Sequence, residues 1–240
     1  MTKFWLSERM LSRVFWEELK FSIFYEEAAS DARKIAEVTA PKVNEFPTEA
    51  GSISIESSIY LWLLSKYFAP RNVLEVGTYI GRSTLAIAFG GRESIEQLYT
   101  CDGTFDCLDF NTLKSPDIKK AKLEAITQIQ YFGKTMSTAL LKELKKKGVK
   151  LDLVFIDGRV SNEDCNILSE VMSDRCVLML DDFEGVEKGV VNAMMLRNAF
   201  RGMFLVNPAV EKNCVSGNLA LLVPTNLLTL TRQQGLPVNM

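Results

Sequence analysis

The sequence predicts an α/β fold class: a doubly wound, mostly parallel sheet with an antiparallel C-terminal strand and an N-terminal helical extension. Three observations support this. From residue 72 onward, short apolar runs rich in β-branched residues alternate with segments of helix length. The last two apolar runs are joined by a connection too short for a parallel crossover, so we expect them to pair antiparallel. Between residues 5 and 38, apolar residues recur every three or four positions.

The N-terminal part of the chain is expected to be helical. Residues 5–38 predict one or two helices with one buried face, and Pro41 and Pro47 then interrupt the pattern. The stretch "IESSIYLWLLSKYFAP" predicts a helix of about four turns that stops before Pro70, because proline has no amide proton to continue the ladder. We expect residues 1–46 to form the extension and residues 47–240 to form the α/β domain.

The strands of the sheet follow in order. The predicted strands are short, mainly apolar runs, as expected where helices cover both faces of a sheet. The five parallel strands are expected at residues 72–77, 97–102, 127–133, 151–157 and 176–182, and the antiparallel pair at residues 200–208 and 217–224.

Composition argues against several partners. A formal net charge of -2 provides no basic field for a phosphate backbone, so we expect no nucleic acid. The most apolar run is interrupted by Lys66, and Glu8 and Arg9 fall within the apolar N-terminal pattern, so neither a membrane span nor a secretory signal is predicted. Five scattered cysteines without metal-type spacing are typical of reduced thiols in a cytoplasmic protein.

The chain contains no histidine. This excludes Ser-His-Asp triads, Cys-His dyads and histidine metal sites. Any chemistry must therefore use carboxylates, lysine, tyrosine, cysteine, a metal or a cofactor.

The stretch "VLEVGTYIGRSTLAIA" (residues 73–88) predicts a ligand-binding turn between a strand and a helix. Gly77 and Gly81 allow the backbone to approach a ligand closely, and Asp102, after the next strand, can accept hydrogen bonds from ribose hydroxyls. Bulky Tyr79 and Ile80 fit poorly with a dinucleotide pyrophosphate, which favours G-x-G-x-x-G. A smaller ligand with a carboxylate and an amine fits better, and S-adenosylmethionine has both groups.

Residues 48–88 resemble the opening of the class I S-adenosylmethionine-dependent methyltransferases, specifically the catechol and caffeoyl-CoA type O-methyltransferases. The similarity continues through "YTCDG", "YFGKTMSTALL", "LVFIDGRVSNED" and "VLMLDDFEG", and so spans roughly residues 48–190 in order. The resemblance implies a Rossmann-like sheet and methyl transfer from S-adenosylmethionine to a hydroxyl of a small molecule. Catechol-like or sugar hydroxyls are the expected acceptors.

The resemblance also implies a cofactor site. Glu75, Gly77 and Gly81 would line the methionine part of the cofactor, and Asp102 would hold the ribose. Lys134 stands where the family usually has an acid near the adenine, so adenine recognition there is expected to use backbone groups. The full set of expected cofactor-binding residues is Glu75, Gly77, Thr78, Gly81, Ser83, Asp102, Gly103, Lys134, Thr135 and Asp157.

Three aspartates follow the fourth and fifth predicted strands. Asp157, Asp181 and Asp182 should meet at one edge of the sheet, where close carboxylates either raise a pKa or bind a hard cation such as Mg²⁺. The resemblance implies that they are metal ligands, with Asp157 and Asp181 catalytic, and that the metal would acidify the acceptor hydroxyl. Alternatively, Asp181 and Asp182 cap the following helix and Asp157 contacts the cofactor amine.

The usual general base is missing. The family commonly has Lys or His two or three residues after the first aspartate, whereas here Arg159 and Val160 occupy those positions, and arginine cannot accept a proton. Either the metal alone acidifies the hydroxyl, a carboxylate such as Asp181 takes the proton, or the reaction is not ordinary O-methylation. Arg159 and Glu184 are expected to contact the substrate, because loops over such an edge carry specificity.

Other hypotheses remain open from the sequence. An NAD-dependent oxidoreductase would use the same type of sheet, and a catalytically inactive S-adenosylmethionine-binding protein would explain the missing base. The expected partner is a small-molecule substrate. Trp5, Trp16, Phe21 and Phe24 could form a substrate lid or the face of a homodimer, although helix packing is the simpler interpretation.

Overall fold

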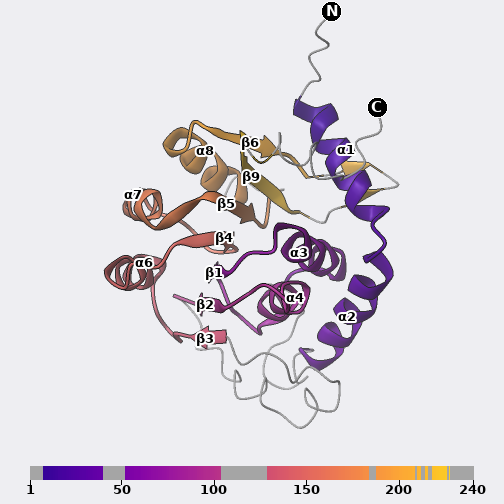
Figure 1. Cartoon of the computed structure of the whole chain (residues 1–240), viewed down its shortest axis with the longest axis horizontal. Coiled ribbons are helices and arrows are strands. Elements are labelled where there is room, and N and C mark those ends of the chain that lie inside the picture. The colour runs from indigo at the N-terminus through magenta and orange to yellow at the C-terminus, as the bar shows by residue number, and fades with distance from the viewer. Residues whose placement is uncertain are drawn as a thin grey trace, which may run out of the picture.

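The computed structural model contains a seven-stranded sheet with the order β3-β2-β1-β4-β5-β9-β6 (Figure 1). The structure describes residues 8–39, 52–103, 129–183, 188–208, 210–211, 214–215, 218–225 and 227. The parallel strands are β1 (Asn72–Val76), β2 (Gln97–Cys101), β3 (Ile129–Tyr131), β4 (Leu151–Ile156) and β5 (Met172–Leu180). β9 (Ala220–Pro224) pairs antiparallel with β5 and with β6 (Met203–Val206). A separate two-stranded pair consists of β7 (Val210–Glu211) and β8 (Cys214–Val215).

Helices cover both faces of this sheet (Figure 1). On one face lie α3 and α4, with α2 outside them, and on the other lie α6, α7 and α8. Successive strand residues face opposite layers: Val73 and Phe155 join one hydrophobic cluster, and Leu74 and Val154 join the other. The helices are α1 (Glu8–Lys20), α2 (Tyr25–Val38), α3 (Ile55–Phe68), α4 (Arg82–Gly90), α6 (Ser137–Lys146), α7 (Asn162–Val171) and α8 (Gly189–Ala199).

The strand order reverses direction between β1 and β4. β1 is hydrogen-bonded to β2 on one side and to β4 on the other. After β1 the chain therefore continues toward one edge of the sheet, and after β4 it continues toward the other. In open α/β sheets, ligands bind at the carboxyl ends of the strands at such a switch point. The carboxyl ends of β1, β2, β4 and β5 form an edge that we call the crest.

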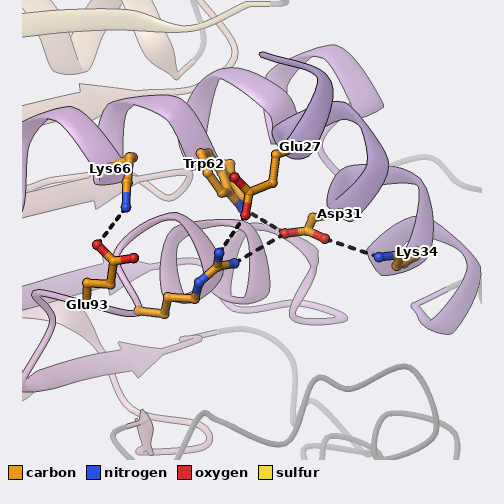
Figure 2. Close-up of polar contacts among 7 residues, drawn as sticks. Glu27, Asp31, Lys34, Trp62, Lys66 and Glu93 are labelled. Carbon is orange, nitrogen blue, oxygen red and sulfur yellow. Dashed lines mark hydrogen bonds and ion pairs between the residues drawn. The ribbon is translucent and has the colours of Figure 1, made fainter. Parts of the chain in front are cut away.

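The second N-terminal helix is tied to the α3–α4 layer by a buried carboxylate (Figure 2). Asp31 of α2 accepts a hydrogen bond from the indole Nε1 of Trp62 at 3.2 Å. Arg92, just after α4, forms ion pairs with Asp31 at 3.6 Å and with Glu27 at 2.5 Å, and lies over the Trp62 ring. Lys34 also pairs with Asp31 at 3.4 Å. A buried carboxylate needs such partners, so this network fixes α2 against the layer below it.

The structure confirms the predicted fold class and the antiparallel C-terminal pairing. Some bounds differ: β3 ends at Tyr131, and β6 is limited to Met203–Val206. β5 begins earlier than residue 176, where a register shift opposite β4 extends its pairing to Met172, and the short antiparallel pair of β7 and β8 lies between the last two sheet strands in sequence. Trp16 is fully buried, as helix packing predicts, whereas Phe21 is exposed. Trp5 lies outside the described residues.

Within the described residues, no helix is both long enough and apolar enough to cross a membrane. Cys101, Cys165 and Cys176 are buried free thiols.

Candidate functional site

The crest brings most of the predicted site residues together. Backbone hydrogen bonds continue past the strand ends: Gly77 N–H donates to the Cys101 carbonyl at 2.8 Å, and Asp157 N–H to the Val76 carbonyl at 2.9 Å. Asp181 N–H donates in the same way to the Ile156 carbonyl at 3.1 Å. The residues that follow β1, β2, β4 and β5 therefore lie side by side.

The turn after β1 has the backbone that its glycines predict. Gly77 has φ +106° and Gly81 has φ +81°, which are backbone conformations that residues with a side chain rarely adopt. A Cβ at Gly77 would lie 3.2 Å from the backbone carbon and the Cβ of Asp157, so this glycine allows the turn to approach the aspartate closely. Gly81 is the N-cap of α4, and glycine has no side chain with which to cap the helix. Its first amides are therefore positioned to receive an anionic group.

Asp102 joins this turn to the predicted adenine segment. Its buried carboxylate accepts the backbone N–H of Tyr79 at 3.0 Å, which supports a residue held at the left-handed φ of 43°. The Asp102 N–H donates to the carbonyl of Gly133 at 3.2 Å, and Thr135 N–H donates to the same carbonyl at 2.7 Å. The predicted ribose carboxylate and the predicted adenine-edge residues are thus neighbours.

Two further predicted residues lie on the outside of this region. Lys134 and Gly103 are exposed, and a Cβ at Gly103 would lie 2.7 Å from the sulfur of Met136. Met136 is itself exposed. Lys134 and Gly103 are thus solvent-exposed residues next to the predicted adenine segment.

Glu75 supports the turn from within the protein core. It is fully buried, and its Oε2 accepts hydrogen bonds from the hydroxyls of Thr84 at 2.5 Å and Thr100 at 2.6 Å. Burial raises the pKa of Glu75 to about 7, against the lowering effect of nearby Ser83, Thr100 and Thr84 hydroxyls. Its Oε1 has no hydrogen-bond partner among the described residues. The two threonines were missed by sequence reasoning. Thr100 lies in β2 opposite Glu75 and Thr84 lies in α4, and residue spacing does not show that they face the carboxylate.

Glu75→Gln is expected to stabilise the protein at high pH and to lose that advantage at low pH. Because the pKa of Glu75 is raised from 4.5 to about 7 in the folded state, ionisation costs folding energy as pH rises through this interval, and the full cost applies above it. We expect the variant to be more stable by about 2–3 kcal/mol near about pH 8, with the difference vanishing below about pH 4.5. Urea unfolding at both pH values measures this, and a difference that does not depend on pH would contradict it.

The three aspartates converge as predicted. One carboxylate oxygen from each of Asp157, Asp181 and Asp182 lies within 4.8 Å of the others. Burial is the main cause that raises the pKa of Asp157 to about 6 and that of Asp181 to about 7, and neighbouring carboxylates add to both shifts. Asp182 sits at the left-handed φ of 55°, which turns the chain sharply after β5. Their oxygen donors suit a hard cation, and the metal site itself stays a prediction.

Sequence reasoning missed a cation in this cluster. Lys188 Nζ donates to Asp157 Oδ1 at 2.5 Å and forms an ion pair with Asp182 Oδ2. Burial alone would lower the pKa of Lys188, but its hydrogen bonds to the two aspartates raise it overall. The sequence prediction considered a base only at the residues just after Asp157. The available sequence signal was Lys188, a single lysine that follows "DDFEGVE" at the start of the next helix.

Helix α8 also fixes the loop after Asp157. Asn192, which is buried, donates from Nδ2 to the Gly158 carbonyl at 2.7 Å and accepts the Val160 N–H at 3.2 Å. Val160, at a position where a base was expected, is buried, whereas Arg159 is exposed. Lys188 occupies the N-cap position of α8, and its side chain does not cap that helix. Glu184 lies outside the described residues.

Solved structures similar to this chain include several methyltransferases. The O-methyltransferase from Bacillus cereus, in complex with SAH, has a TM-score of 0.55 and 18% identity, covering 81% of this chain and 90% of its own. TomG from Streptomyces achromogenes, an O-methyltransferase involved in tomaymycin synthesis and solved with SAM, has a TM-score of 0.56 and 18% identity over 82% and 90%. SAH-bound PaMTH1 from Podospora anserina has a TM-score of 0.52 and 14% identity over 93% and 99%. These likenesses establish the fold.

The sequence itself gives the family. A comparison with curated proteins found no match. A family model described as O-methyltransferase matches residues 26–167, more than half of the chain and a range that includes the glycine turn, Asp102 and Asp157. This chain belongs to the O-methyltransferase family.

Proposed function

We propose that this O-methyltransferase uses S-adenosylmethionine and methylates a hydroxyl of a small molecule at the crest. The observation that carries the proposal is the meeting, at one switch point of the sheet, of a helix N-terminus with glycine at its N-cap, a buried ribose-type carboxylate and an acidic cluster. Membership of the O-methyltransferase family favours this activity over the oxidoreductase alternative. SAM or SAH is bound in the similar solved structures, which supports the same cofactor here.

Each part of the cofactor has a proposed partner. The first amides of α4, near Ser83, would bind its carboxylate, and Asp157 would lie near its amine. Asp102 would hold the ribose hydroxyls, with Gly133 and Thr135 beside the adenine. When bound, S-adenosylmethionine supplies an electrophilic methyl group. Glu75 supports the turn through Thr84 and Thr100, so its proposed contribution is to hold the methionine-binding backbone in place.

The acidic cluster is proposed to prepare the acceptor. The bound cofactor would supply the methyl group to the acceptor oxygen, and Asp181 would accept the proton of that hydroxyl. Asp181 is the best placed, because Lys188 hydrogen-bonds to the other two aspartates. Arg159, exposed on the loop after β4, is proposed to contact the rest of the substrate. Catechol-like and sugar hydroxyls are the first acceptors to test.

Calorimetric titration with S-adenosylhomocysteine tests the cofactor assignment. The wild-type protein is expected to bind it, and Asp102→Ala to weaken the affinity by about tenfold to a hundredfold, because a buried carboxylate that bonds ribose hydroxyls is lost. Asp152→Ala is the matched control: Asp152 also accepts backbone amides, from Arg71 and Asn72, but at the opposite end of the sheet. Its affinity should be unchanged.

Two outcomes would redirect the proposal. Thermal stabilisation by NADH but not by S-adenosylhomocysteine would overturn it in favour of the oxidoreductase. Binding of S-adenosylhomocysteine without methyl transfer to any member of a panel of catechols and sugars would instead favour a binding protein that has lost catalysis. Transfer of isotopically labelled methyl to one of the acceptors supports the enzyme.

The homodimer and the cytoplasmic location are also proposals. The turn between α1 and α2 exposes Phe21 and Ile23, at 83% and 89% of their surface, which offers an apolar face for a second copy. Sedimentation velocity would determine the oligomeric state.

A further inference from the structure

We infer that Lys188 is the built-in cation of the acidic cluster and takes the position that a divalent metal would otherwise occupy. The inference rests on the proposed function only in placing the methyl acceptor at this cluster. It concerns what the three aspartates bind, and that can be measured without cofactor or acceptor.

The first support is the position of the ammonium. Lys188 Nζ contacts one carboxylate oxygen of Asp157 and one of Asp182, two of the three side chains that would coordinate a metal. A metal ion bound by all three aspartates would lie within a few ångströms of this ammonium. In a half-buried site, two cations so close repel strongly. Metal binding therefore requires Lys188 to leave.

The second support is the way helix α8 holds Lys188 in place. A Cβ on Gly189 would lie 2.5 Å from the Asp181 carbonyl oxygen and 2.6 Å from the Asp182 carbonyl carbon and oxygen. The start of α8 thus packs directly on the backbone of the two aspartates, an approach that only glycine permits. One turn further on, Asn192 is hydrogen-bonded to the loop after Asp157. Both flanks of the cluster are tied to α8, so Lys188 is placed by the fold and not by a flexible surface loop.

The third support is the charge of the cluster. Three carboxylates in a half-buried position need a compensating cation, and the described residues that contact them provide one in Lys188. A lysine ammonium carries this charge without a solution ion. Methyl transfer by the wild-type protein is then expected to proceed without added Mg²⁺ and in the presence of a chelator.

Manganese binding tests the inference directly. Free Mn²⁺ is measured by electron paramagnetic resonance during titration of the wild type, Lys188→Met and Lys188→Arg, with no cofactor present. We expect Lys188→Met to bind one Mn²⁺ at least about tenfold more tightly than the wild type, with Mg²⁺ competing for it. Lys188→Arg keeps the positive charge and should bind no more tightly than the wild type. Anomalous scattering from Mn²⁺-soaked crystals of Lys188→Met should locate the ion among the three aspartates.

Several results would overturn the inference. One is tight binding of a single Mn²⁺ by the wild type that Asp182→Asn abolishes. Another is a folded Lys188→Met variant that gains no affinity, since the lysine would then not be what excludes the metal. If Lys188→Met does not fold, Lys188→Gln replaces it, and the wild-type titration still decides whether the cluster takes a metal. S-adenosylhomocysteine binding is measured in a separate experiment. If the Mn²⁺ titration contradicts the role of Lys188, the cofactor assignment is unaffected, and if S-adenosylhomocysteine does not bind, the Mn²⁺ result is unaffected.

Discussion

Replacing Gly90 with alanine is expected to lower the free energy of unfolding by about 3–5 kcal/mol. Gly90 ends α4 where that helix packs against α3, and an added Cβ would lie 2.0 Å from the carbonyl oxygen of Trp62 and 2.7 Å from its carbonyl carbon. Both atoms belong to the backbone of a buried helix, so a rotamer change cannot relieve the overlap. The two helices must separate, which opens the core around Trp62.

The neighbouring glycine provides the control. A Cβ at Gly91 would also be close to other atoms, 2.3 Å from Cδ1 and 2.6 Å from Cγ1 of Ile95, but these belong to a side chain that can change its rotamer. We expect Gly91→Ala to cost less than about 1.5 kcal/mol. Urea unfolding of both variants measures the difference. Equal costs would mean that the α3–α4 backbone contact is not as tight as described.

Gly77→Ala is expected to weaken S-adenosylhomocysteine binding by about a hundredfold or more. The residue has φ +106°, and its Cβ would lie 3.2 Å from Asp157, so the turn would have to change its backbone and move away from the crest. The turn connects β1 to the start of α4, the proposed carboxylate site. A shift there displaces the donors from the ligand and is measured by calorimetry.

The Gly148→Ala variant is the control that distinguishes backbone strain from the loss of close contact between the turn and Asp157. It also has a left-handed φ, +68°, but a Cβ there would meet no atom within 4 Å. Gly148→Ala should therefore cost about 1 kcal/mol of stability and leave the affinity for S-adenosylhomocysteine unchanged. If both variants lost affinity equally, the effect of Gly77→Ala would reflect general destabilisation and not the geometry of the turn.

The sheet could be predicted because its signals are local. Strands such as β1 and β4 are short apolar runs bounded by polar or glycine residues, and their alternation with helices restricts the topology to a few arrangements. The convergence of Asp157, Asp181 and Asp182 followed from the same rule, because the carboxyl ends of parallel strands meet at one edge. Gly77 and Gly81 could be placed at the turn because no other residue adopts their backbone easily.

The direction of Glu75 could not be predicted. A strand covered by helices on both faces lacks the alternation of polar and apolar residues that would show where a side chain points. The fold directs Glu75 toward Thr84 and Thr100, where it supports the turn from within the core.

By itself, the sequence determined the fold class, the glycine turn and the edge of the sheet where the carboxylates gather, because these depend on residue type and on neighbours in the chain. Only the tertiary structure decided what the carboxylates meet. Lys188 follows Asp182 closely in sequence, but its ammonium reaches Asp157, which follows a different strand, because Gly189 lets α8 pack on the crest. Such a contact depends on the path of the chain in space, which residue spacing does not specify.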